Sequence, residues 1–131
     1  MHYFVTGATG FIGRRLVRRL LARRGATVHF LVRRGSEARV ADLLAYWGAT
    51  KGRAIPVVGD LTARRLGVAA EQIKSLKGRI DAVYHLAAVY DLAADAQTQV
   101  AVNVEGTRHL VEFAQAIQAA HLHHVSSIAA A

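Results

Sequence analysis

The sequence predicts an α/β fold, a doubly wound parallel sheet with helices on both faces. Short apolar runs alternate with longer segments of helical spacing along all 131 residues. The runs are nearly continuous, as expected for strands buried on both faces. A glycine-rich turn, TGATGFIG at residues 6–13, stands between the first run and the first helical segment. Since such alternation builds right-handed βαβ units, we expect strand order 3-2-1-4-5, ending with strand 5, and a ligand crevice beside strand 1.

Local patterns give the elements in order. We expect strands at 2–6, 27–32, 53–58, 80–86 and 121–126, and helices at 11–24, 37–47, 69–76 and 95–119. The first helix carries one apolar stripe and one basic face, and Gly25 is predicted to cap its C-terminus. Pro56 has no N–H to donate to a sheet, so the third strand is predicted to lie at an edge.

Length and composition are typical of one globular domain. Hydrophobic residues make up 53% of the chain, enough for a buried core. No apolar run reaches the roughly 18 residues needed to span a bilayer, and the N-terminus does not resemble a signal peptide. The chain has no cysteine, which excludes disulfides and Cys-ligated metals and is compatible with the cytoplasm, the compartment we expect.

The basic charge raises the question of nucleic-acid binding. Lys and Arg number 17 against 9 Asp and Glu, for a net charge of +8. Many of the arginines fall within residues 14–24, on one face of the first predicted helix, and no aromatic residue interleaves with them there. The pattern favours a solvated helix surface, and we expect no specific nucleic-acid partner.

The glycine turn is predicted to hold a dinucleotide. Gly7 permits a tight turn after the strand, Gly10 lets the backbone approach a pyrophosphate, and Gly13 lets the helix pack close to the sheet. The N–H groups that open the helix then face the phosphates. The alternative is a glycine-rich turn without a ligand. The cofactor-binding residues predicted here are Gly7, Thr9, Gly10, Phe11, Ile12 and Gly13.

Two arginines indicate which dinucleotide is bound. Arg33 and Arg34 follow the second strand, where a carboxylate that accepts from a ribose 2′-hydroxyl is often found. Guanidinium groups instead donate to a 2′-phosphate, so NADP is predicted over NAD. Arg14 could add a further positive charge. Asp60 could accept from the adenine amino group. The alternatives are arginines that point to solvent and an aspartate that stabilises a turn.

Several motifs in this order resemble the extended short-chain dehydrogenase/reductases, a superfamily with a Rossmann fold. They are TGATGFIG, VVGDL, YHLAA, NVEGTRHLVEFA and HHVSSIAA. Within that branch, LVRRGS and GDLTARRLGV look most like the fatty acyl-CoA and thioester reductases. The resemblance implies an oxidoreductase that uses NADPH to reduce a carbonyl or an activated acyl group. The partner it implies is a small-molecule substrate, such as an acyl thioester.

The same resemblance implies roles for particular residues. Ser127 corresponds to the catalytic serine that hydrogen-bonds the substrate carbonyl oxygen, and Ser126 is the near alternative. Either could instead be a strand-end hydroxyl that satisfies the backbone. Asn103 would support the backbone near the active site. The residues that would line the cofactor are Asp60, Leu61, Leu86, Ala87 and Ala88.

One departure from the family pattern is serious. None of the four tyrosines has a lysine four residues later, although the family uses such a pair as proton donor and its activator. We therefore expect residues 1–131 to be the N-terminal NAD(P)-binding part of a longer reductase, inactive alone, with an exposed strand-5 edge open to self-association. The alternatives are a naturally short NADP-binding module without catalysis, or part of a sugar-nucleotide epimerase or dehydratase.

The histidines do not indicate a metal centre. His121 and His123 share a strand face and His124 points away, so the HLHH run does not favour a metal site. His85 is expected to be packed or hydrogen-bonded rather than to act as a general base.

Overall fold

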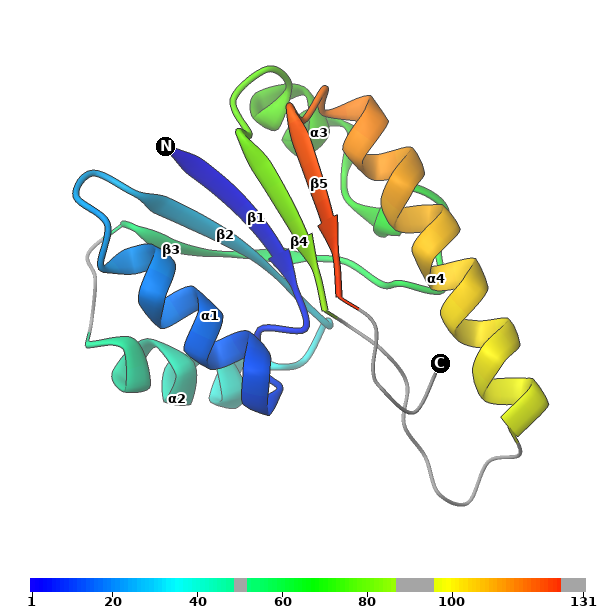
Figure 1. Cartoon of the computed structure of the whole chain (residues 1–131), viewed down its shortest axis with the longest axis horizontal. Coiled ribbons are helices and arrows are strands. Elements are labelled where there is room, and N and C mark those ends of the chain that lie inside the picture. The colour runs from blue at the N-terminus through cyan, green and yellow to red at the C-terminus, as the bar shows by residue number, and fades with distance from the viewer. Residues whose placement is uncertain (49–51, 87–95, 126–131) are drawn as a thin grey trace.

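A computed structural model describes residues 1–48, 52–86 and 96–125, and it confirms the predicted fold class. Five parallel strands form one sheet in the order β3-β2-β1-β4-β5 (Figure 1). The strands are β1 His2–Thr6, β2 Thr27–Val32, β3 Ala54–Val58, β4 Ala82–His85 and β5 His121–His124. The helices are α1 Phe11–Leu21, α2 Glu37–Trp47, α3 Ala70–Leu76 and α4 Ala96–Ala116, with a short 3-10 helix, η1, at Arg64–Gly67.

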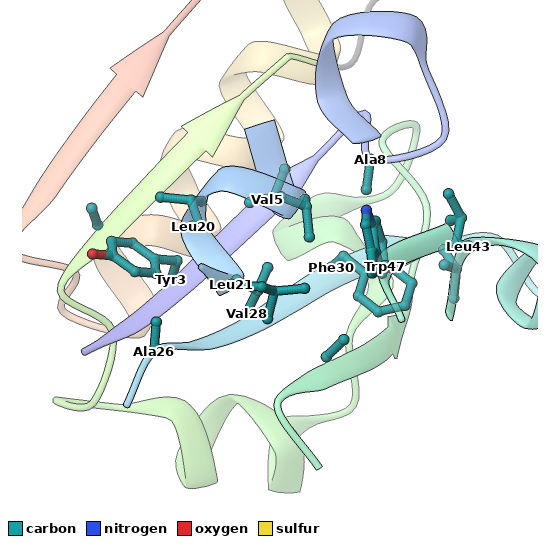
Figure 2. Packing of buried hydrophobic residues seen from close by; sticks show 14 residues of the cluster. Tyr3, Val5, Ala8, Leu20, Leu21, Ala26, Val28, Phe30, Leu43 and Trp47 are labelled. Atoms are coloured by element: carbon teal, nitrogen blue, oxygen red, sulfur yellow. The ribbon is translucent and has the colours of Figure 1, made fainter. Parts of the chain in front are cut away.

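The helices cover both faces of the sheet. Helices α1 and α2 lie together on one side, and α3 and α4 lie on the other (Figure 1). In the first layer the Trp47 ring stands edge-on to Phe30, with centroids 5.0 Å apart (Figure 2). The Trp47 indole N–H donates to Arg14 O at 2.9 Å and so joins α2 to α1. In the second layer Phe4 packs on Phe113 of α4.

The first helix is shorter than predicted. It ends at Leu21 rather than Arg24, its C-terminal cap is Ala22, and Gly25 takes its positive φ of 74° in the turn that follows. Arg53, just before β3, supplies the reason. Its guanidinium donates to the carbonyls of Leu21 and Arg23, and its Nε donates to Ala26 O at 2.8 Å. A distant side chain therefore satisfies the carbonyl of the last helical residue and two carbonyls of the turn that follows.

The other predicted bounds need smaller corrections. Strands β3 and β4 and helices α3 and α4 are each shorter than expected by one to a few residues at one or both ends. The strand predicted over 121–126 ends at His124, and residue 126 lies outside the described residues. The η1 helix was not predicted at all. Arg65 and Leu66 adopt φ values of 51° and 59° there, a left-handed conformation that non-glycine residues rarely take.

Pro56 explains how one edge of the sheet is finished. Gly59 N donates to Val32 O at 2.9 Å, so alternate residues of β3 direct their N–H groups toward β2. Position 56 lies between these residues and faces outward, where a missing N–H costs no hydrogen bond within the sheet. The predicted edge position of this strand is confirmed. The opposite edge is β5, whose four residues are all exposed.

Candidate dinucleotide site

The carboxyl ends of the strands lie level with one another. The register pairs Val5 with Phe30 and Thr6 with His85. Since the strands are parallel and about 4.8 Å apart, the turns that follow β1, β2 and β4 are neighbours at one edge. β3 joins them, because Val32 is paired with Val58. Ligands of doubly wound sheets bind above this edge, where the strand order reverses beside β1.

The glycine turn is built as the spacing predicts. Gly7 has a φ of 79°, and Gly10 N donates to Gly7 O at 3.1 Å. A Cβ on Gly13 would lie 1.8 Å from Gly7 O, so only glycine allows α1 to pass so close to the turn. A Cβ on Gly10 would lie 3.4 Å from the same oxygen, an ordinary contact. Its absence leaves backbone exposed beside the helix start.

The N-terminus of α1 offers donors to an anion. The first intrahelical hydrogen bond runs from Arg14 N to Gly10 O at 3.0 Å, so the N–H groups of residues 11–13 precede the helical ladder. In the described structure no side chain caps this helix, and its first turn contains no acidic residue. Thr9 is exposed, as are Phe11 and Ile12, at 66% and 62%. This end of α1 is therefore open and positively polarised.

The two arginines after β2 share one hollow. It has a volume of about 490 Å³ and lies between the β2–α2 turn and the edge of β3. Arg33 and Arg34 are both exposed, and valine and proline side chains form the apolar part of the lining. Arg14 is not part of this lining, since its guanidinium lies 5.8 Å from the Tyr46 ring of α2. The residues that line the hollow are Val32, Arg33, Arg34, Gly35, Ser36, Glu37, Val40, Pro56 and Val58.

Asp60 lies at the start of a braced loop. Its Oδ1 accepts from the backbone N and the hydroxyl of Thr62, at 2.9 and 2.7 Å. These hydrogen bonds, with the nearby charge of Arg33, hold the pKa of Asp60 below its usual range. Asp60 is therefore ionised beside Arg33. The turn role that was the alternative for Asp60 is present in the structure, and contact with adenine stays a proposal.

Left-handed residues shape the same loop. Asp60 N donates to Leu66 O at 2.7 Å, and Leu66 is fully buried. A Cβ on Gly59 would meet that oxygen at 2.5 Å, so the loop closes only over glycine. Arg64 Nε lies 3.5 Å from a Glu112 carboxylate oxygen, which joins η1 to α4. Sequence reasoning missed Gly59, although a glycine directly between a strand and an aspartate was the available signal.

Helix α4 closes the site from the second face. Gly106 packs at Leu61, since a Cβ on Gly106 would lie 3.6 Å from the Leu61 Cβ. A glycine inside a helix was the signal for this contact. Asn103 lies one turn earlier and is half-buried, and Leu86 is partly buried against the first core layer. Four predicted site residues lie outside the described residues, namely Ala87, Ala88, Ser126 and Ser127.

The histidines of β4 and β5 make hydrogen bonds and ring contacts. His85 is buried, with Nδ1 at 2.7 Å from the Thr6 hydroxyl, which confirms a packed and hydrogen-bonded side chain. In β5, His123 stacks on Tyr84 with centroids 4.8 Å apart, and His124 lies 5.2 Å from the His85 ring. Within the described ranges no group of three or more metal-ligating side chains is found. Nor does any described helix have the length and apolarity needed to cross a membrane.

A parallel sheet in this order, with a glycine turn that opens α1 beside the strand reversal, defines a dinucleotide-binding domain of the Rossmann class. The family assignment agrees. Residues 5–131 match the NAD-binding family described as "Male sterility protein". The chain belongs to this family.

The relatives of the chain include proteins named as a reductase, a synthase and a demethylase. It is 37% identical to sterol demethylase protein B of Methylococcus capsulatus, over 99% of this chain and 35% of that protein. It is 34% identical to a linear gramicidin synthase of Brevibacillus parabrevis, over 95% of this chain and 3% of that protein. A putative fatty acyl-CoA reductase of Drosophila melanogaster is 31% identical, over 88% of this chain and 23% of that protein. The chain thus spans about a third or less of each relative.

Solved structures share the architecture. The terminal R domain from the myxalamid PKS-NRPS biosynthetic pathway superposes with a TM-score of 0.83 at 31% identity, over 99% of this chain and 35% of that chain. Gre2 of Candida albicans, solved with NADPH, superposes with a TM-score of 0.78 at 24% identity, over 99% of this chain and 38% of that chain. The second likeness shows the fold alone.

Proposed function

We propose that this chain is the NADP-binding portion of a reductase that transfers hydride between NADPH and a carbonyl or acyl-thioester substrate. The observation that carries the proposal is the pairing of an open glycine cradle at α1 with two arginines that share a hollow one strand away. Membership of an NAD-binding family supports it. So do relatives whose names describe a fatty acyl-CoA reductase and a terminal R domain.

The residues fit such a cofactor. The space at Gly10 lets a pyrophosphate approach the backbone closely. The N–H groups of residues 11–13 and the positive end of the α1 dipole then face its charge. Arg33 and Arg34 are proposed to hold the 2′-phosphate through charge-assisted hydrogen bonds. Asp60 and Leu61 are proposed to border the adenine. When bound, the nicotinamide supplies the hydride, and the protein's task is to hold the ring and the substrate in place.

Ser127 and Asn103 are the residues proposed to lie on the substrate side. Ser127 is proposed to donate a hydrogen bond to the substrate carbonyl oxygen, and Asn103 to support the backbone near it. An acyl thioester is favoured because one relative is named as a putative fatty acyl-CoA reductase, and acyl-CoA is a thioester. The cysteine-free composition fits a reducing cytoplasm, which we propose as the compartment. We also propose that the exposed edge of β5 allows self-association.

Cofactor titration tests the central proposal. NADPH should bind more tightly than NADH, by about tenfold to a hundredfold, the usual value of charged hydrogen bonds to one phosphate. Arg33→Asp should abolish or invert the preference. Arg24→Asp is the matched control, because it makes the same charge change at an exposed residue in the turn after α1, and it should keep the preference. Equal binding of the two cofactors by the unmutated protein would refute the arginine assignment.

A further inference from the structure

His85 joins three neighbouring elements to β4. Its Nδ1 lies 2.7 Å from the Thr6 hydroxyl of β1, and its Nε2 lies 3.3 Å from the Thr107 hydroxyl of α4. Its backbone carbonyl accepts from Val125 N at 3.1 Å, just after β5. The side chain is only 2% exposed. A buried residue with these partners connects β1, β4, β5 and α4 at one point.

The ring that forms the bridge is uncharged near pH 7. A neutral imidazole donates through one nitrogen and accepts through the other, and a hydroxyl can meet either need. The groups that face the ring from β1 and α4 are the uncharged Thr6 and Thr107, and His124 is the titratable group that faces it from β5. Burial, and to a smaller extent His124, lower the pKa of His85 to about 4. The ring is therefore neutral near pH 7.

The bridge lies directly beneath the candidate site. Thr6 and His85 are paired across β1 and β4, and the residues that follow them are Gly7 and Leu86. Leu86 N donates to Thr6 O at 3.2 Å, so the residue directly after β4 is itself hydrogen-bonded to the last residue of β1. Any displacement of the two strand ends would be passed to the glycine cradle one residue later.

The same bridge fixes one face of α4. Residues three and four apart share a helix face, so Asn103, Gly106 and Thr107 lie together. Gly106 contacts Leu61, and Thr107 contacts His85. The helix is thereby held against the loop that follows β3 and against the last residue of β4, with Asn103 on the face that both contacts fix.

We propose that His85 is a positioning residue for the dinucleotide site, in which its neutral ring locks β1 to α4 beneath the turns that receive the cofactor. The identity of the ligand rests on the proposed NADP function, but the effect of the bridge on the structure of the turns does not. It predicts that loss of the bridge loosens those turns whether or not a cofactor is present.

Two substitutions at different ends of the bridge test the proposal. His85→Phe keeps an aromatic ring and removes both side-chain hydrogen bonds, and Thr107→Val removes only the hydroxyl on α4. Each should weaken NADPH binding about tenfold or more, as misplacement of a positioned group commonly does. Thr107→Ser keeps a hydroxyl at this position, so its NADPH affinity should be close to that of the unmutated protein. Amide hydrogen exchange at Gly7–Gly10 and at Leu86 should accelerate in His85→Phe without any cofactor.

His29→Phe is the matched control. His29 is also buried, and its pKa is likewise lowered to about 4, by burial and by His2, but it sits three residues before the end of β2. Its loss should lower stability while NADPH affinity and exchange at the turns stay unchanged. Equal loss in His29→Phe, or unchanged affinity and exchange in His85→Phe and Thr107→Val, overturns the proposal. If the unmutated protein fails to bind NADPH, the proposed function fails, and the exchange measurement still decides the role of His85.

Discussion

Gly13→Ala tests whether the backbone of α1 packs so closely on the turn after β1 that residue 13 cannot carry a Cβ. The added Cβ would stand 1.8 Å from Gly7 O and 2.6 Å from Gly7 C. Since ordinary contact begins at 3.4 Å, the helix must retreat from the turn by about 1.6 Å. Both clashing atoms are backbone, so no side chain can rotate away. Overpacking of this kind costs about 1–3 kcal/mol, and a backbone clash belongs at the upper end of that range.

The gain in helix propensity offsets part of this cost. Alanine is better than glycine inside a helix by about 1 kcal/mol, which leaves a net loss near 2 kcal/mol. For a domain of this size the melting temperature should fall by roughly 10 °C. Urea unfolding followed by fluorescence of the single tryptophan, Trp47, measures the loss in free energy of unfolding. NADPH affinity should also fall, because the retreating helix carries the phosphate-facing N–H groups with it.

Gly10→Ala is the companion that separates packing from binding. Its Cβ would lie 3.4 Å from Gly7 O, and the φ of −76° suits alanine. Stability should change by no more than about 1 kcal/mol, the usual scale at a helix N-cap. NADPH binding should nevertheless fall at least about tenfold, because the methyl group occupies the approach of the pyrophosphate. A Gly13→Ala protein as stable as the parent would show that the turn and the helix leave room for a Cβ at residue 13.

Three further predictions concern stability. Arg65→Gly should stabilise by roughly 0.5 kcal/mol in urea unfolding, because relief of the left-handed strain exceeds the entropy of glycine; Arg64→Gly is the control and should not. The unfolded state protonates His29 and His85 near pH 6.5 but the folded state only near 4, so stability should fall as the pH is lowered across that window, by about 3 kcal/mol for each. A flat profile in acid unfolding would contradict this. Trp47→Ala should cost about 3–5 kcal/mol by thermal unfolding.

The sequence was enough to predict the sheet order, the glycine turn and the edge position of β3, because each depends on residues close together in the chain. Continuous apolar runs and helical spacing mark buried strands and crossover helices wherever they occur. Pro56 reveals an edge by its own chemistry, since it lacks an N–H. Gly7 and Gly13 are likewise explained within one turn and one helix.

What could not be predicted depends on distant partners. The end of α1 was placed three residues late because Arg53, 30 residues away from Arg23, satisfies the carbonyls there. The η1 helix escaped notice because two non-glycine residues, Arg65 and Leu66, adopt left-handed angles there, and the burial of Leu66 depends on distant partners. The His85 bridge joins residues separated by 79 and 22 positions, which no local pattern reveals.

The two borders of the sheet have unlike chemistry, and this limits how copies could join. On the β3 side, Pro56 puts a ring where an incoming chain would need a donor, so that border resists extension. On the β5 side, the four residues of a short strand are exposed among the residues that the structure describes. A head-to-tail stack needs both borders and would grow into an open fibre, whereas pairing through β5 alone is a twofold arrangement that closes at two copies.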